Sequence, residues 1–181
     1  MIHTDDRGSF TEFYRYEALA EVAGHPLELR QANQSVSRAG VIRGIHYALV
    51  PPGQAKYVSA PRGSFIDFVI DLRVSSPTFG RWESVRIDDA QRNSVYLSEG
   101  LGHAVVSLVD DAVLSYLVSS VFDPTRELTI NPFDAEIGLE LPPEARRDLV
   151  SAKDLAAPTL AEAQRDGLLP SFPEPARLGQ P

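Results

Sequence analysis

The chain has 181 residues, of which 43% are hydrophobic and 23% charged, a composition that favours a single globular domain over residues 1–181. A formal net charge of −8 argues against a nucleic-acid-binding protein, because no basic excess exists to neutralise many phosphates, although a few local cations suffice for a small anionic ligand. The chain has no cysteine, which excludes disulfides, thiolate nucleophiles and cysteine metal sites.

The N-terminal residues MIHTDDRG are polar, and no run of about 18 apolar residues occurs further along. We therefore expect no secretory signal, no membrane span and a cytoplasmic location. Residues 14–23 have helical propensity, and Gly24 with Pro26 ends the predicted helix.

Short β-rich runs recur from about residue 29 to 120, separated by turn signals. They are VIRGIHYALV (41–50), AKYVSA (55–60), SFIDFVIDLRV (64–74), RWESVRI (81–87), NSVYLSEG (93–100), HAVVSLV (103–109) and AVLSYLVSSV (112–121). Their spacing, without intervening helices, predicts an antiparallel sandwich or barrel. After residue 122 we expect one helix near 158–166 and a flexible Pro-rich tail at 171–181.

His46 ends the sequence RGIH inside a strongly β run. Side chains alternate along a strand, so we expect His46 to share a face with Gly44 and Ala48, whose small size leaves room beside a cavity. The sequence also allows the alternative that His46 is a hydrogen-bonded histidine inside the core, without a role at a cavity.

His103 ends GLGH, which resembles the second conserved box of cupins. The first cupin box needs a His-x-His pair and a following Glu, whereas this chain has Gly-Ile-His-Tyr-Ala with one imidazole. Two histidines make a poor zinc or iron site, so a metal site is the minority interpretation, and we expect neither a metal nor an organic cofactor.

Asp67 lies in the middle of an otherwise apolar strand and shares a face with Phe65, Val69 and Asp71. A buried carboxylate requires a cation or hydrogen-bond donors, which Lys56 or a histidine would supply. For Asp71 we prefer an ion pair with the nearby Arg73.

Tyr116 lies in a β run where core packing is the default interpretation. If it faces the cavity, its phenol is a candidate proton donor.

Taken together, these residues resemble the dTDP-4-dehydrorhamnose 3,5-epimerase family from about Asp5 to Pro170. The matching segments are DDRGSFTE (5–12), QANQSVSRAGVIRGIHY (31–47), QAKYV (54–58), DLRVSSPTFG (71–80), YLSEGLGHA (96–104) and SAKD (151–154). Variant forms such as PPGQAKYV and LAEAQRDGLLP look closest to members of actinobacterial antibiotic deoxysugar pathways.

The resemblance implies a mainly β, double-stranded β-helix (a cupin-like jelly roll) with short flanking helices, and a homodimer. It implies epimerisation of a dTDP-linked 4-keto-6-deoxyhexose at C3 and/or C5 without a cofactor. It assigns His46 as general base, Asp154 as the carboxylate that orients it, Lys56 as the cation beside the C4 oxygen and Tyr116 as proton donor. The implied substrate contacts are Arg7, Phe10 (near thymine), Glu12, Gln31, Asn33, Arg43 (diphosphate), and the polar pair Asp67 and His103.

This chemistry suits an acidic protein, because a diphosphate needs few arginines and proton transfer next to a ketone needs no redox cofactor. Val121 and Phe122 stand where the family often has tyrosines, so the sequence does not decide which carbon is epimerised. Alternative functions are a 3,4-ketoisomerase, a metal-dependent cupin oxygenase and a non-catalytic nucleotide-sugar-binding cupin.

Overall fold

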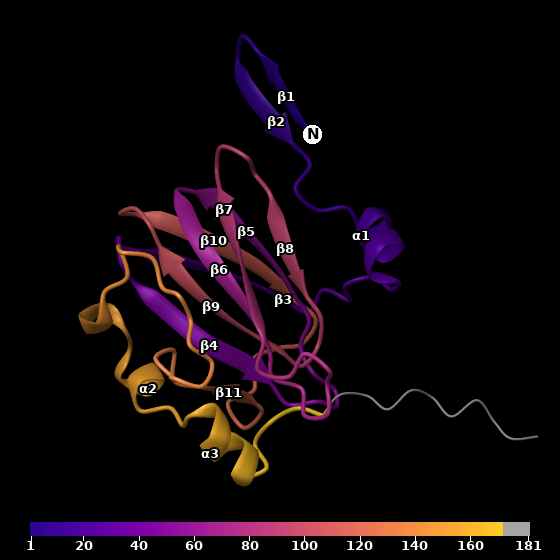
Figure 1. Cartoon of the computed structure of the whole chain (residues 1–181). Coiled ribbons are helices and arrows are strands. Elements are labelled where there is room, and N and C mark those ends of the chain that lie inside the picture. Colours follow the sequence, from indigo (N-terminus) through magenta and orange to yellow (C-terminus); the bar gives the residue numbers. More distant parts are fainter. Residues whose placement is uncertain (172–181) are drawn as a thin grey trace, which may run out of the picture.

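The computed structural model describes residues 1–171 and contains two packed antiparallel sheets (Figure 1). The four-stranded sheet has the order β3 (Gln31–Ser37), β10 (Ala112–Val118), β5 (Lys56–Arg62) and β8 (Ser94–Leu97). The five-stranded sheet has the order β11 (Glu127–Thr129), β4 (Ile42–Ala48), β9 (Leu101–Ser107), β6 (Ser64–Asp71) and β7 (Trp82–Asp88). The predicted mainly β, two-layered jelly roll is therefore confirmed.

Two helices were expected and both form. The first, α1, spans Tyr16–Ala23, and the later one, α3, spans Leu160–Arg165 and begins with a capping box between Thr159 and Glu162. Two short elements were not predicted, the 3-10 helix η1 (Arg147–Leu149) and the four-residue helix α2 (Ala152–Leu155). Of the predicted tail, Ser171 pairs with Val74 in a β-bridge, and residues 172–181 lie outside the described residues.

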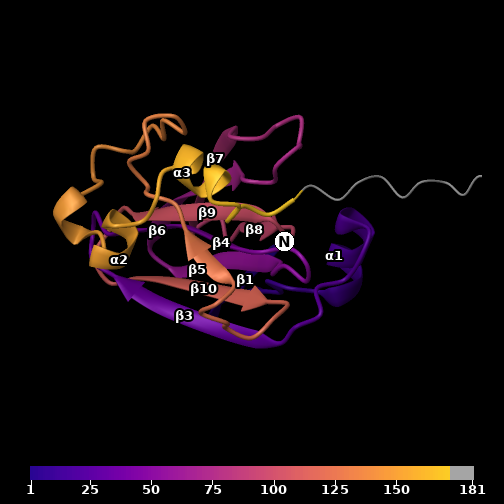
Figure 2. The same cartoon turned by 90° about the horizontal axis from the view of Figure 1, so that it is seen from below.

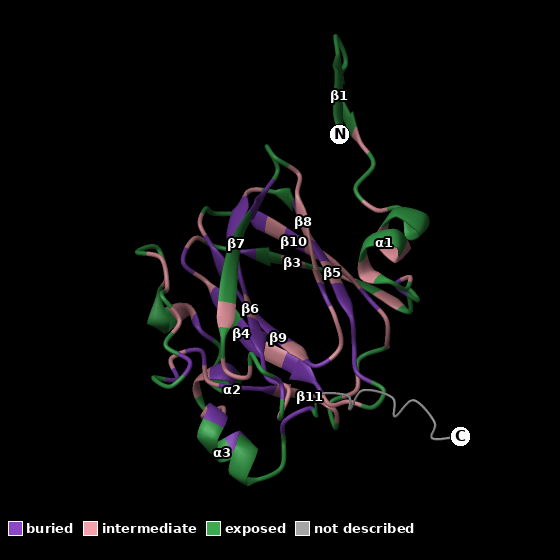
Figure 3. Ribbon diagram, turned by 45° about the vertical axis from the view of Figure 1, so that its right-hand side comes forward, coloured by how far each residue is buried: buried purple, intermediate pink, exposed green. Residues whose placement is uncertain are grey.

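A hairpin of β1 (Ile2–Asp5) and β2 (Gly8–Thr11) was also not predicted, and it projects away from the two sheets (Figure 1). Nearly every residue in the hairpin is exposed, as Figure 3 shows in green for the labelled β1. Among the described residues, the Arg92 guanidinium of the body donates hydrogen bonds to the hydroxyls of Ser9 and Thr11 in the hairpin. An isolated two-stranded hairpin has little stability of its own.

Strand β6 confirms the predicted alternation, because its two faces belong to different apolar clusters. Phe65 and Val69 pack between the two sheets with side chains of β5, β8, β9 and β10. Phe68 and Ile70 pack on the outer side of the five-stranded sheet, against the C-terminal segment. Figure 2 shows α3 over that outer side and α2 beside the ends of the strands, and residues after β11 pack against this sheet.

Gly44 has a different role from the one expected. The register between β4 and β9 shifts between Arg43 and His46, so strict alternation is interrupted there. Gly44 has a φ of +123°, and a Cβ atom at this position would lie 2.5 Å from the carbonyl oxygen of His103. Glycine is therefore required by the close approach of β9 rather than by the space around the imidazole. No helix among residues 1–171 is long and apolar enough to cross a membrane.

Candidate active site

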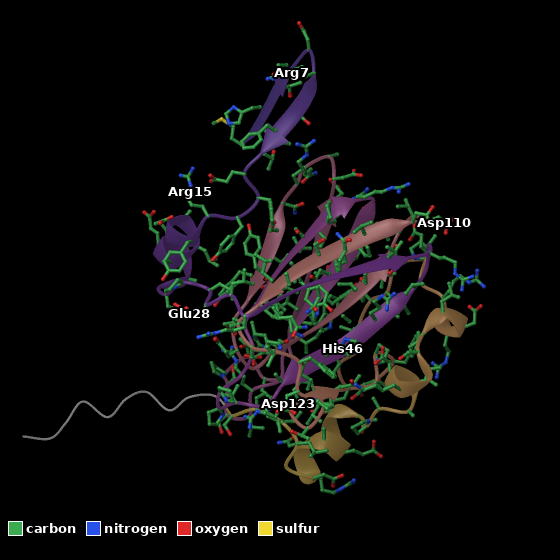
Figure 4. The ribbon with its side chains drawn as sticks, turned by 180° about the vertical axis from the view of Figure 1, so that it is seen from behind. Arg7, Arg15, Glu28, His46, Asp110 and Asp123 are labelled. Atoms are coloured by element: carbon green, nitrogen blue, oxygen red, sulfur yellow. The ribbon has the colours of Figure 1, made fainter. Side chains whose placement is uncertain are left out.

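Two cavities meet at His46. One, of about 320 Å³, lies between the sheets, and its lining includes Lys56, His103, Tyr116, Gln31 and Asn33. The other, of about 620 Å³, is lined in part by Arg43, Ser151 and Asp154. His46 and Lys153 line both cavities, and Figure 4 shows His46 on β4 in the body of the protein.

The four-stranded sheet brings its polar residues together by register. Tyr116 of β10 lies opposite Asn33 of β3 and Val58 of β5. Two residues further along β10, Val118 lies opposite Gln31 and Lys56. Residues directly opposite each other in an antiparallel sheet point to the same face, so this sheet presents one polar group of side chains inward.

The five-stranded sheet supplies the imidazoles. His46 lies opposite His103 of β9 on one side and opposite Thr129 of β11 on the other. The Nδ1 atom of His103 lies 3.3 Å from Oδ1 of Asp67, which confirms that a histidine partners this fully buried carboxylate. Burial lowers the pKa of His103, and the nearby Asp67 carboxylate only partly opposes that effect.

Asp154 reaches His46 from α2. The Nε2 atom of His46 lies 2.9 Å from Oδ1 of Asp154, and the backbone N–H of Gly44 donates to the other oxygen at 3.4 Å. A carboxylate only accepts hydrogen bonds, so Nε2 carries the proton and Nδ1 keeps a free lone pair. In the neutral imidazole this contact selects the tautomer with the proton on Nε2, which leaves Nδ1 able to accept a proton.

The Asp154 carboxyl is buried, which by itself raises its pKa. Hydrogen bonds from His46, Gly44 and Ser151 outweigh that effect, and the net pKa of Asp154 is lowered. The group therefore stays ionised beside the imidazole at neutral pH.

Lys56 and Tyr116 face the smaller cavity, and neither the ammonium nor the phenol donates a hydrogen bond to another residue of the described chain. Burial lowers the pKa of Lys56, while the Glu127 and Asp67 carboxylates act in the opposite direction. Burial also raises the pKa of Tyr116, so this phenol keeps its proton. Both groups are available as donors to a ligand.

Arg43 lies at the larger cavity, where its guanidinium donates to the Ser37 hydroxyl and the Val36 carbonyl. The expected ion pair between Asp71 and Arg73 is confirmed, with Nε 2.9 Å from Oδ1. Ser76 and Thr78 also donate to the Asp71 carboxylate, and none of these groups lines either of the two cavities.

Sequence reasoning missed several cavity residues, namely Gln54, Glu127, Thr129 and Lys153. Glu127 Oε1 accepts from the Gln54 side chain at 3.1 Å and from the Asp123 backbone at 3.3 Å. Lys153 adjoins Asp154 within SAKD, and Gln54 begins QAKYV, so both lie in segments that the sequence had marked.

Four expected substrate contacts line neither cavity, namely Arg7, Phe10, Glu12 and Asp67. Asp67 is fully buried and contacts His103, which does line the smaller cavity. Arg7 lies at the projecting hairpin, far from His46 in Figure 4, and its side chain is 91% exposed. Phe10 is 68% exposed, and Glu12 pairs with Arg15.

No group of three or more His, Cys, Asp or Glu side chains placed to hold a metal ion occurs within the described part of the chain. The candidate site brings together an imidazole hydrogen-bonded to a carboxylate, a buried ammonium and a phenol beside one cavity. Such a set can remove a proton from carbon and return one.

The family model for dTDP-4-dehydrorhamnose 3,5-epimerase matches residues 1–162. A dTDP-4-dehydrorhamnose 3,5-epimerase of Mycolicibacterium smegmatis is 49% identical over 172 residues, which cover 95% of this chain and 84% of the relative. A dTDP-4-dehydro-6-deoxyglucose 3-epimerase of Streptomyces bikiniensis is 48% identical and covers 95% and 87%.

Among solved structures, this chain resembles a 4-keto-6-deoxy sugar epimerase from the novobiocin biosynthetic gene cluster of Streptomyces spheroides. The TM-score is 0.91 at 48% sequence identity, over 94% of this chain and 85% of that one.

Proposed function

This chain belongs to the dTDP-4-dehydrorhamnose 3,5-epimerase family, and we infer that it is an isomerase that epimerises a dTDP-linked 4-keto-6-deoxyhexose at C3 and/or C5. The observation that carries the assignment of residues is the hydrogen bond between His46 and Asp154 beside a cavity that Lys56 and Tyr116 also line.

The first step is removal of a proton from a carbon next to the C4 ketone. We propose that Nδ1 of His46 accepts this proton and that Asp154 stabilises the imidazolium that forms. The electron pair of the broken C–H bond moves onto the ketone oxygen to give an enolate.

The second step is protonation of that enolate carbon from the opposite face. The buried Lys56 ammonium, which faces the cavity, stabilises the oxyanion with its charge. Tyr116 belongs to the four-stranded sheet, whereas His46 belongs to the five-stranded sheet, and both line the cavity. The Tyr116 phenol donates its proton to the carbon, which inverts the centre. Proton transfer from His46 back to Tyr116 through solvent restores both groups.

We propose that the hexose occupies the smaller cavity, where Gln31, Asn33 and His103 contact its polar groups. The diphosphate then lies toward the larger cavity, beside Arg43 and Lys153. Arg43 has the fork geometry that suits phosphate oxygens, and the two cavities join at His46.

Relatives of comparable identity are named as 3,5-epimerase and as 3-epimerase, so the carbon that reacts must be measured. The experiment is incubation of dTDP-4-keto-6-deoxyglucose with the enzyme in D2O, followed by NMR. Deuterium at both C3 and C5 identifies 3,5-epimerisation, and deuterium at one carbon identifies that carbon alone. A migrated carbonyl would instead identify a 3,4-ketoisomerase, and binding without exchange would identify a non-catalytic protein.

We further propose that the protein is a homodimer whose hairpin β1–β2 completes the site of the partner subunit. Ile2 and Phe10 expose apolar side chains, and the strands of the hairpin pack on each other rather than on the two large sheets, which favours a covering surface from a second copy. In this arrangement Arg7, Phe10 and Glu12 contact a nucleotide bound mainly by the other chain.

An enzyme that consumes a nucleotide-linked sugar works where that sugar is made, so we propose a cytoplasmic location and a place in deoxysugar biosynthesis. The similarity to an epimerase of the novobiocin gene cluster supports a role in an antibiotic pathway.

A further inference from the structure

Asn131 connects two segments that meet at the His46–Asp154 pair. Its Nδ2 donates to the carbonyl oxygen of Leu155 at 2.9 Å, and its Oδ1 accepts from the backbone N–H of Phe133 at 2.9 Å. Its backbone N–H donates to Pro158 at 2.9 Å. The carbonyl can only accept and the N–H can only donate, so the two partners fix which way the amide points.

The element that carries Asp154 needs such support. Helix α2 has four residues, too few to be stable without contacts at its ends. Its start is held by the Ser151 hydroxyl, which accepts from the backbone N–H of Asp154. At its end, the carbonyl of Leu155 lies in the last turn, where carbonyls lack a partner within the helix, and Asn131 supplies one.

Asn131 is also connected to β4, the strand that carries His46, through its neighbour Ile130. Ile130, directly before Asn131, exchanges both backbone hydrogen bonds with Ile45, directly before His46, at 2.9 and 3.0 Å. A closed path therefore runs from His46 through Ile45, Ile130, Asn131 and Leu155 to Asp154, and the imidazole–carboxylate bond of 2.9 Å completes it.

We propose that Asn131 is a positioning residue, whose side chain sets the distance and angle between Asp154 and His46. This inference rests on the proposed function of that pair in proton abstraction. Asn131 lines neither cavity, so it acts on the reaction through Asp154 and not through the substrate. A shift of about 1 Å in a catalytic group costs roughly 10²-fold in rate, which gives the effect its scale.

The test compares Asn131→Asp and Asn131→Ala with the wild-type enzyme. Asn131→Asp keeps the acceptor for Phe133 and removes the donor to Leu155, and Asn131→Ala removes both bonds. For each variant, kcat and KM, the Kd for dTDP, and the 15N chemical shifts of the His46 ring are measured. We expect kcat to fall about 10–100-fold with dTDP affinity unchanged. We also expect the ring signals to change from one tautomer to a mixture.

The matched control is Thr159→Ala, which removes the cap of α3 in the same segment and leaves the bond to Leu155 intact. It should lower the melting temperature while keeping the wild-type kcat and tautomer. The ring signals report on folded molecules, so they decide the question even if a variant is less stable.

Deuterium exchange, measured with the wild-type enzyme and with His46→Ala, separates this inference from the proposed function. Absence of exchange with the wild-type enzyme, or full exchange with His46→Ala, would refute the proposed function. Wild-type exchange that His46→Ala abolishes, together with a wild-type kcat and a single tautomer in both Asn131 variants, would refute the role of Asn131 alone.

Discussion

His46 and Asp154 are separated by 108 positions in the chain, yet Nε2 of one lies 2.9 Å from Oδ1 of the other. His46 comes from β4, next to the edge strand of the five-stranded sheet, and Asp154 comes from a four-residue helix that contacts β4. The carboxylate fixes the tautomer that leaves Nδ1 free, and the proposed chemistry depends on this contact.

Replacing Asp154 by Asn is expected to lower kcat by roughly 10²–10⁴-fold, because the amide no longer stabilises the imidazolium. The Kd for dTDP, measured by calorimetry, should remain close to that of the wild type. Asp148→Asn is the control, since Asp148 lines the same larger cavity but pairs with Arg146 at the surface. Equal losses of kcat in the two variants would contradict a specific role for Asp154.

Tyr116→Phe is expected to separate proton removal from inversion. His46 can still take the proton and return a solvent deuteron to the same face, so deuterium enters the substrate while the epimeric product falls by roughly 10²–10⁴-fold. NMR of the reaction in D2O measures both rates. Tyr47→Phe makes the same chemical change at a phenol that donates to the Leu168 carbonyl away from the cavities. Normal product formation by Tyr116→Phe would eliminate the phenol as donor.

The alkaline limb of the pH profile is expected to report on Lys56. Its ammonium stabilises the enolate only while protonated, and burial lowers its pKa below the usual 10.5. Activity should therefore fall, as pH rises, earlier than an exposed lysine would allow. Lys56→Arg keeps its charge at high pH and should move this limb upward at a reduced kcat.

Asp67→Asn should shift the alkaline limb of the activity profile in the direction opposite to Lys56→Arg, because the Asp67 carboxylate raises the pKa of Lys56. Removing that charge should move the alkaline limb to lower pH. Alkaline limbs that coincide in the wild type and both variants would show that another group titrates there.

Asp71→Asn is expected to destabilise the fold by about 1.5–3 kcal/mol at neutral pH, because the carboxylate accepts charged and hydroxyl hydrogen bonds from Arg73, Ser76 and Thr78. Burial raises the pKa of Asp71, but these bonds prevail and lower it below the usual 3.8. A carboxyl group with a lowered folded-state pKa contributes stability above its unfolded pKa and loses it as pH falls through the folded value.

The difference between wild type and Asp71→Asn should thus be full above about pH 5 and shrink in more acidic solution. Urea unfolding at several pH values measures it. A difference that does not depend on pH would show that packing, not the charge, is responsible.

Complementation is expected between two inactive variants if the hairpin serves the partner subunit. In a mixed dimer of His46→Ala and Phe10→Ala, one of the two sites combines an intact base with an intact hairpin. Equal mixtures that are unfolded and refolded together should recover roughly a quarter of the wild-type activity. Each variant refolded alone gives the baseline. No recovery, with mixed dimers demonstrated by mass spectrometry, would contradict the proposed sharing.

The sequence alone predicted the β architecture, the two faces of β6 and several of the residues around His46, among them Lys56, Tyr116 and His103. Alternation with a period of two is a local pattern, and the matching motifs lie in short contiguous segments. It missed β3 as a separate strand because the less exposed face of β3 carries the polar residues Gln31, Asn33 and Ser35, so the expected apolar alternation is absent.

Only the tertiary structure decided which of the marked residues meet. Lys56, Tyr116 and His46 come together because strand register aligns them, and Asp154 joins them through hydrogen bonds at both ends of α2. Arg7 and Phe10, marked with equal weight by the sequence, lie on a hairpin away from both cavities. Sequence patterns carry local periodicity, whereas the distance between residues far apart in the chain depends on how whole elements pair and pack.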